Sequence, residues 1–238
     1  LGYTTIRKER DSMFKYETHL HTWPVSACAR ATVFETLSFY KSMDYDGVFI
    51  TNHFLDGNIS ADTSLPYDKQ IEFYFSDYEE GIKIGEEIGI KVFLGIESSY
   101  KGTDFLIFGL DKQWFLSHPE IMRMKKSEQL HYFRKNGALV IQAHPFREAA
   151  YIDHIRLFPR CIDGVEVINA GRTPFENKMA ALYAEEYNLL RTAGTDNHLA
   201  GNQTRFAGVA FSSPLKDEQD FICRIKKGDG EIFTFELK

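Results

Sequence analysis

Short apolar runs alternate with helix-like stretches along most of this chain, and that alternation limits the folds it can adopt. The runs are rich in β-branched and aromatic residues, which is typical of buried strands. After a first strand that ends near His21, they cover residues 46–51, 90–97, 104–110, 138–144, 164–169, 189–196 and 206–212. Alternating strands and helices form right-handed βαβ units, so we predict an α/β protein with a mostly parallel sheet, open or closed into a barrel.

Four segments have the spacing of a capping box, in which a Ser or Thr begins a helix and a Glu follows three residues later. These pairs are Thr32 and Glu35, Ser76 and Glu79, Ser117 and Glu120, and Thr173 and Glu176. Pro174 follows the last of these threonines, at the first helical position, where proline is favoured. We therefore expect a helix to begin at each of the four.

Length and composition favour one globular domain. The 238 residues contain no linker, internal repeat or low-complexity tract, and α/β barrels reach this length as one unit. We predict a single domain over residues 1–238, with residues 1–15 as a candidate N-terminal extension.

Charge, cysteine content and hydropathy restrict the compartment and the partners. No uncharged stretch approaches the roughly 20 residues that cross a bilayer, so we expect no membrane span. The opening residues lack the pattern of a secretory signal, so we expect no signal peptide there. Three widely spaced cysteines fit a reducing cytoplasm better than a disulfide framework. The net charge of −6 disfavours nucleic acid and favours a small substrate. The oligomeric state stays open.

Polar side chains that can bind metals follow the downstream ends of the expected strands. Side chains two residues apart share a face of a strand, so His19 and His21 project together. The complete set is His19, His21, His53, Glu97, His144, Asp196 and His198. Because the carboxyl ends of parallel strands converge on one rim, we predict a site there with enough ligands for two or three divalent metal ions.

The motifs "HLH", "TNHF", "GIES", "AHPF" and "GTDNH" occur in the order and approximate spacing of the polymerase and histidinol phosphatase (PHP) superfamily, which the chain resembles from about Tyr16 to Phe211. The resemblance implies a distorted (β/α)7 TIM-like barrel with a trinuclear centre of Zn, Mn or Fe that hydrolyses phosphate esters. It also implies three ligand sets: His19, His21, Glu97 and Asp196 for one ion, Glu97 and His144 for a second, and His53 and His198 for a third.

The sequence departs from the family pattern at three places. Ser26 and Ala27 stand where relatives place an acidic or histidine ligand, so the third ion is expected to be the weakest. Asn52 replaces the usual aspartate before the second-motif histidine. For the second ion, the additional ligand is either Asp104 or Asp111, and the sequence does not choose between them.

Other polar residues are candidates for supporting roles. Arg147 and Arg172 are predicted to bind the substrate phosphate, because a guanidinium binds phosphate through two parallel hydrogen bonds. Glu166 and Asn169 reach the same rim and have either a structural role or contact with substrate or ligand histidines. Cys28 is expected to be a buried, inert thiol, with a place in the pocket as the alternative. We expect His118, His131 and His154 at the surface.

The sequence therefore predicts a metal-dependent phosphoric ester hydrolase that acts on a small phosphomonoester. Ions that share the catalytic carboxylates Glu97 and Asp196 would activate a bridging hydroxide for attack on phosphorus. Histidinol phosphate, phosphotyrosine, and phosphodiesters or nucleotides are alternative substrates that the motifs do not separate. A non-catalytic metal-binding module is the alternative from another class of protein.

Overall fold

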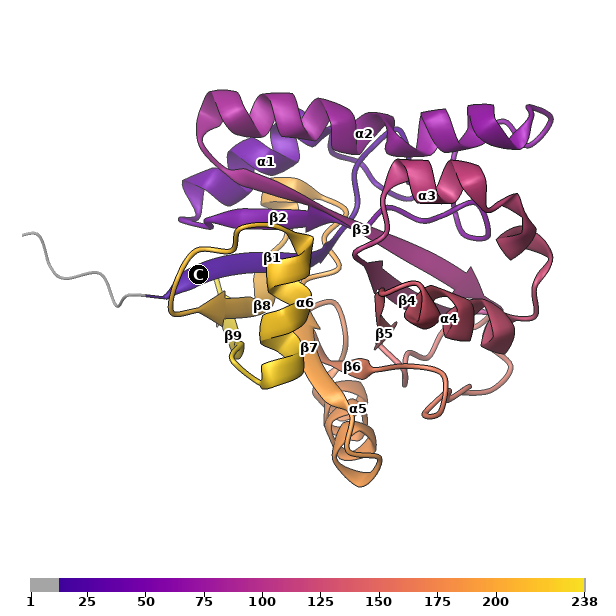
Figure 1. Cartoon of the computed structure of the whole chain (residues 1–238). Helices are drawn as coiled ribbons and strands as arrows, with labels where there is room; N and C mark the ends of the chain where they lie inside the picture. The colour runs from indigo at the N-terminus through magenta and orange to yellow at the C-terminus, as the bar shows by residue number, and fades with distance from the viewer. Residues whose placement is uncertain (1–12, 238) are drawn as a thin grey trace, which may run out of the picture.

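The computed structural model describes residues 13–237, which form one mixed sheet of nine strands with helices around it (Figure 1). The order across the sheet is β7-β6-β5-β4-β3-β2-β1-β8-β9. The strands are β1 (Phe14–Leu20), β2 (Gly47–Ile50), β3 (Lys91–Tyr100), β4 (Thr103–Phe108), β5 (Leu139–Ala143), β6 (Gly164–Asn169), β7 (Leu190–Gly194), β8 (Arg205–Phe211) and β9 (Glu231–Glu236).

The sheet curls until its first and last parallel strands meet. The Thr18 hydroxyl of β1 donates to the carbonyl of Ala193 in β7 at 2.7 Å, and Leu20 forms an isolated parallel bridge with Asn197 just beyond β7. Strands β1, β2, β3, β5, β6 and β7 run in the same direction, because β4 is antiparallel to both of its neighbours. The expected barrel-like α/β fold is confirmed.

The strict alternation of strands and helices is wrong at β3 and β4, which are joined by a two-residue hairpin. Lys101 and Gly102 both have positive φ angles, 52° and 79°, as the favoured type of two-residue hairpin turn requires. A Cβ at Gly102 would also lie 2.7 Å from Ile152. Strands β8 and β9 are antiparallel as well, and β9 was not predicted.

Helices cover the outside of the sheet, with α1 and α2 on one side, α3 and α4 on another and α5 on a third (Figure 1). Their bounds are α1 (Val33–Ser42), α2 (Tyr67–Ile88), α3 (Lys112–Ser117), α4 (Lys126–Lys135), α5 (Pro174–Glu186) and α6 (Glu218–Lys227), with short 3-10 helices at Pro119–Arg123 and Ala200–Asn202. None of the helices in the described range is long and apolar enough to cross a membrane.

Two of the four expected helix starts are confirmed and two are wrong. Thr32 and Thr173 form complete capping boxes with Glu35 and Glu176. In contrast, Ser76 lies inside α2, and Ser117 is the last residue of α3. Both serine hydroxyls donate to a carbonyl of the preceding turn, at 2.7 and 2.9 Å, a local bond that a serine within a helix makes in place of a cap.

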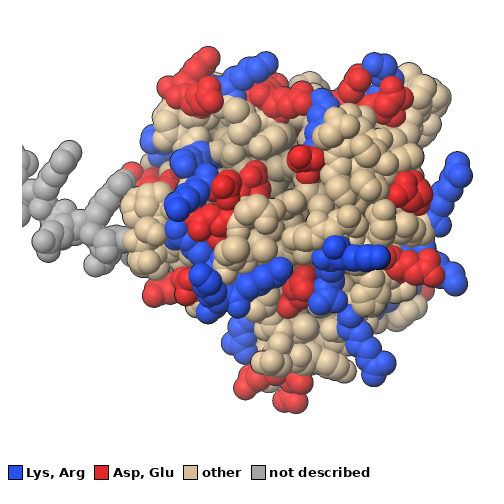
Figure 2. All heavy atoms as spheres, viewed as in Figure 1, with Lys and Arg blue, Asp and Glu red and all other residues tan. Residues whose placement is uncertain are grey.

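Helix α6 closes the end of the barrel opposite the expected metal rim. Its buried side chains Phe221, Ile222 and Ile225 share a core cluster with Tyr16 and Phe49 at the beginning of the strands. Each such side chain contributes roughly 1.5–3 kcal/mol when it is fully buried. Basic and acidic side chains are interspersed on the face shown in Figure 2.

Residues 1–12 of the candidate N-terminal extension lie outside the described residues. Phe14 and Lys15, at its other end, already belong to β1, where they pair with Phe211 and Ala210 of β8.

Candidate metal centre

The structure brings all seven predicted metal-ligand candidates together at the carboxyl ends of the parallel strands. His19 and His21 come from the end of β1, Glu97 from β3, and the others from the segments that follow β2, β5 and β7. Their donor atoms form groups whose members all lie within 4.8 Å of one another. The groups are His19, His21 and Glu97; His19, His144 and Asp196; Glu97, Asp104 and His144; and His21, His53 and His198.

Glu97 lies between these groups and is only 1% exposed. Its Oε1 is 3.1 Å from Nε2 of His19 and 3.5 Å from Nε2 of His144. Its Oε2 is 3.3 Å from Nε2 of His21 and 2.7 Å from Nδ1 of His53. One carboxylate therefore faces four imidazoles, with two on each oxygen.

Asp104, and not Asp111, belongs to the site. Asp104 is buried, and its Oδ2 is 3.8 Å from Nε2 of His144. Asp111 caps α3 by accepting a hydrogen bond from the backbone N–H of Trp114 at 2.7 Å. The pattern at residue 111, an aspartate before a helix, was the signal that could have separated them. We call His19, Glu97, Asp104, His144 and Asp196 the inner cluster.

Several buried polar atoms at the site have no satisfactory partner among the described residues. His144 Nδ1 makes no hydrogen bond, and the close approach of His53 Nδ1 to Glu97 Oε2 lacks hydrogen-bond geometry. Unsatisfied buried polar groups are costly, so they call for a ligand or ion. Imidazole nitrogens and carboxylates are suitable donors for Zn²⁺, Mn²⁺ or Fe²⁺, and the cluster therefore fits divalent metal ions.

Side chains beneath the inner cluster orient its donors. Glu166 Oε1 lies 2.8 Å from Nδ1 of His19, and Glu166 Oε2 accepts from the Asn169 amide at 2.9 Å and from the backbone N–H of His144 at 3.1 Å. A carboxylate on Nδ1 directs the other ring nitrogen, Nε2, toward the centre. Gly194 permits this packing, because a Cβ there would lie 2.5 Å from the Cβ of His19 and 2.8 Å from Glu166.

The residues where relatives place a third-ion ligand have other roles here. The buried Ser26 hydroxyl lies 3.0 Å from Nδ1 of His21 and donates to the Asn52 side-chain carbonyl at 2.9 Å, whereas Ala27 is exposed. Asn52 in turn donates to Asp77 at 3.1 Å. These bonds orient His21 from below, so Ser26 and Asn52 support a ligand candidate instead of being ligands.

Two ligand candidates have backbone conformations that side chains rarely adopt. The φ angle is +24° at His144 and +59° at Asp196. Such residues cost of order 1–3 kcal/mol each and persist where the surrounding structure holds them, often at functional sites. At Asp196 the backbone N–H donates to the carbonyl of His19 at 2.7 Å, which ties the strained turn to β1.

The charges in the inner cluster shift the pKa values of its members. Burial favours the neutral acid, yet the surrounding histidines hold the pKa values of Glu97 and Asp196 well below their usual range. Burial lowers the pKa of His19, but three nearby carboxylates raise it well above its usual value. Burial and the charge of Glu97 raise the pKa of Asp104. Glu97 and Asp196 are therefore ionised at neutral pH and available to bind cations.

The outer side of the centre contains a residue that the sequence placed wrongly. Cys28 is half-buried and lines the cavity above the site together with His53 and His198. Burial raises the pKa of the Cys28 thiol, but these two histidines lower it to about 6. The thiol is therefore not an inert core residue. We call His53, His198 and Cys28 the outer cluster.

A cavity of about 370 Å³ opens over both clusters, and three cationic side chains line it. Arg147 lies 3.4 Å from Asp104 through Nη1 and also contacts the Tyr151 hydroxyl. The Nε atoms of Arg147 and Arg172 have no hydrogen-bond partner among the described residues. Lys101 on the β3–β4 turn is the third cation. It was missed because a hairpin was not expected there.

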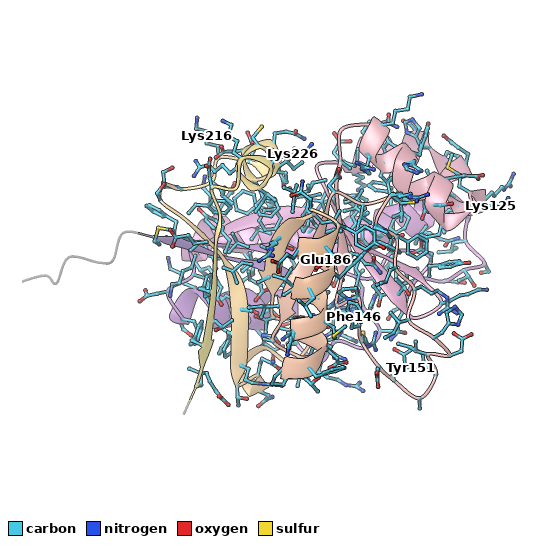
Figure 3. All side chains as sticks on the ribbon, turned by 90° about the horizontal axis from the view of Figure 1, so that it is seen from below. Lys125, Phe146, Tyr151, Glu186, Lys216 and Lys226 are labelled. Atoms are coloured by element: carbon cyan, nitrogen blue, oxygen red, sulfur yellow. The ribbon has the colours of Figure 1, made fainter. Side chains whose placement is uncertain are left out.

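The remaining histidines lie away from the cluster. His131 and His154 are exposed, whereas His118 is half-buried and stacks on Trp114 with ring centroids 4.3 Å apart. The loop that carries Tyr151 lies opposite the end of the molecule where Lys216 precedes α6 and Lys226 lies in its last turn (Figure 3).

Solved structures with a similar fold support this architecture, although no protein-family model and no curated protein matches the sequence. A two-domain protein from Bacteroides vulgatus, described as containing a predicted PHP-like metal-dependent phosphoesterase, matches 94% of the chain at 15% identity and a TM-score of 0.63. The chain spans 65% of that protein's length.

Two further structures are similar over most of both chains. PsfC from Pseudomonas syringae matches 95% of this chain and 92% of its own length, at 16% identity and a TM-score of 0.59. A putative metal-dependent phosphoesterase from Bifidobacterium adolescentis matches 78% of this chain and 88% of its own, at 14% identity and a TM-score of 0.54. The chain therefore has the fold of PHP-like metal-dependent phosphoesterases, as the sequence motifs predict.

Proposed function

We propose that this protein is a metal-dependent phosphoesterase that hydrolyses a small phosphomonoester. The observation that carries the proposal is the position of Glu97, a buried carboxylate that faces four histidines at the floor of a cavity lined by Lys101, Arg147 and Arg172. This arrangement has the donors for more than one divalent ion and cations for an anionic substrate.

The residues divide into those that would hold metal and those that would hold substrate. His19, His21, Glu97 and Asp196 would bind one ion, Glu97, Asp104 and His144 a second, and the histidines of the outer cluster a third. Bound divalent ions would lower the pKa of a coordinated water and stabilise charge on phosphoryl oxygens. Glu97 would balance the charge between the first two ions, and Asp196 would complete the first site.

Arg147 and Arg172 would orient the phosphoryl group. Within residues 13–237, neither guanidinium Nε–H has a hydrogen-bond partner, and Arg147 is held at Asp104, beside the second set of donors. Charge-assisted hydrogen bonds from Arg to phosphate are short and fix its orientation. A cavity of about 370 Å³ is near the lower end of the usual size for small-molecule sites, which favours a small substrate over a polymer.

The test is hydrolysis of model esters by chelator-treated protein that is then supplied with Mn²⁺, Zn²⁺ or Fe²⁺. We expect metal-dependent release of p-nitrophenol from p-nitrophenyl phosphate, faster than from the bis-ester, followed by identification of the natural substrate in a screen of phosphorylated metabolites. Preferential cleavage of the bis-ester would contradict the proposed phosphomonoesterase activity and show that the protein is a phosphodiesterase. Tight metal binding without hydrolysis of any ester would show that the protein is a non-catalytic metal-binding module.

A further inference from the structure

The outer cluster combines two histidines with a thiol on the wall of the same cavity. Cys28, His53 and His198 all line this cavity. The other two cysteines are far from any such pair, since Cys161 packs against a core cluster and Cys223 is exposed on α6.

The backbone on each side of Cys28 is tied to the two loops that carry these histidines. The N–H of Ala27 donates to the carbonyl of Asn58 at 2.9 Å, in the loop that follows His53. The N–H of Arg30 donates to the carbonyl of His198 itself at 2.8 Å. The segment therefore bridges the loops, and the Cys28 thiol is positioned before any ion binds.

The histidine nitrogens at this side are also oriented for binding. Nδ1 of His198 lies 2.9 Å from the carbonyl of Asp196, so Nε2 is the nitrogen left for a ligand. His21 groups with His53 and His198, but Ser26 occupies its Nδ1, and its Nε2 also lies near Glu97 and Asp196. The lone pair of Nε2 can bind only one ion. If His21 binds in the inner cluster, the outer ion needs another donor.

From this geometry we propose that Cys28 is a protein ligand of the outer ion, together with His53 and His198. This inference rests on the metal-binding part of the proposed function. The thiol loses its proton to solvent as the sulfur–metal bond forms, and the thiolate supplies the negative charge that neither Ser26 nor Ala27 provides. A thiolate with two imidazoles favours Zn²⁺, Fe²⁺ or Co²⁺ over Mn²⁺ and Mg²⁺.

Cobalt substitution tests the sulfur ligand directly and does not depend on catalysis. Metal-free protein titrated with Co²⁺ should develop the near-ultraviolet thiolate-to-cobalt charge-transfer absorption when the outer ion binds. Cys28→Ser should lose this absorption and bind the outer ion at least about tenfold more weakly, since even residues that only orient ligands change affinity by 10- to 100-fold. Cys161→Ser and Cys223→Ser are the matched controls and should retain it.

A rescue variant separates a ligand from a structural role. Cys28→Asp should bind the outer ion more tightly than Cys28→Ser while showing no charge-transfer absorption, because the carboxylate restores a charged donor without sulfur. In the wild-type protein, bound Zn²⁺ should also protect one thiol from Ellman's reagent, and Cys28→Ser should remove that protected thiol.

Two results would overturn the inference while leaving the proposed function intact. One is wild-type protein that binds three Co²⁺ ions without charge-transfer absorption, so that the outer site is filled, and the other is absorption that persists in Cys28→Ser. Protein that binds no divalent ion at all would contradict the proposed function as well, so the two failures are distinguishable.

Discussion

The inner and outer clusters share one cavity but are built differently. The inner side chains are 0 to 10% exposed, and Glu166 fixes the ring of His19 from beneath. In the outer cluster His53 and His198 are 13% and 24% exposed, and His198 is oriented by a backbone carbonyl. The inner donors are shielded from solvent, whereas the outer histidines are more exposed. We therefore expect inner ions to bind more tightly and to exchange more slowly.

Removing the charge of Glu97 should have the largest effect, because both inner ion sites depend on it. Glu97→Gln should remove most bound metal and lower kcat/KM for the best phosphomonoester by at least about 100- to 1000-fold, the loss seen when one charge-stabilising group is removed from an active site. Metal content by elemental analysis and kinetics measure both effects. Glu186→Gln, on the far end of α5 (Figure 3), is the control and should change neither. Full metal content in Glu97→Gln would show that the two inner ions do not depend on a shared Glu97 carboxylate.

A second buried carboxylate, Glu17, lies next to the inner cluster and makes the free energy of unfolding depend on pH. Glu17 accepts hydrogen bonds from the N–H groups of His19 and Thr195 and from the Tyr40 hydroxyl. Burial raises its pKa to about 7, although these bonds oppose the shift. Its contribution to the free energy of unfolding is therefore fully present below about pH 4.5 and is lost as the pH rises to about 7.

Glu17→Gln keeps the acceptor for both N–H groups but cannot ionise. Relative to the wild type, the metal-free variant should gain stability as the pH rises from about 4.5 to 7, by on the order of 3 kcal/mol. Urea unfolding of both proteins at several pH values, with chelator present, measures the difference. A constant difference across this range would show that Glu17 titrates normally.

Arg147 should affect substrate and not metal. A guanidinium stays protonated and has no lone pair for a cation, so Arg147→Ala should leave metal content unchanged. A charged hydrogen bond contributes about 1.5–3 kcal/mol, which corresponds to a 10- to 100-fold loss in kcat/KM. Arg147→Lys should recover part of this loss. Unchanged kinetics in Arg147→Ala would show that Arg147 only contacts Asp104 and Tyr151 and does not bind the substrate.

Glu166 should affect metal affinity through the orientation of His19. Glu166→Gln keeps an acceptor for Nδ1 but loses its charge, so inner-ion affinity should fall by about 10- to 100-fold while kcat at saturating metal changes little. Competition with a fluorescent chelator measures the affinity. Equal weakening of the inner and outer ions would contradict the difference between the clusters.

The sequence was most informative where chemistry and strand ends coincide. His19, Glu97, His144 and Asp196 lie at the ends of expected strands, so the convergence of parallel strands was enough to predict that they meet. Asp104 lies at the beginning of the antiparallel strand β4, and the sequence did not separate it from Asp111. Glu166 could be placed at the rim, but its bond to His19 depends on Gly194, which lets two strands approach closely. That contact between distant segments has no local pattern.

The wrong predictions have identifiable physical causes. Ser76 and Ser117 have the spacing of capping boxes, but hydrogen bonds to the preceding turn place them within α2 and at the end of α3. Cys28 was misjudged because its partners come from two loops that lie near residues 53 and 198, and backbone bonds that join those loops are not visible in a sequence.

Anomalous scattering at the metal edge, from crystals of Zn²⁺-loaded protein, tests the central claim most directly, since it counts ions and locates them. The account predicts two ions that share the Glu97 carboxylate, with His19 and His21 at one and His144 and Asp104 at the other, and a third ion at His53 and His198. A single ion in the inner cluster, or two ions of which only one contacts Glu97, would contradict it.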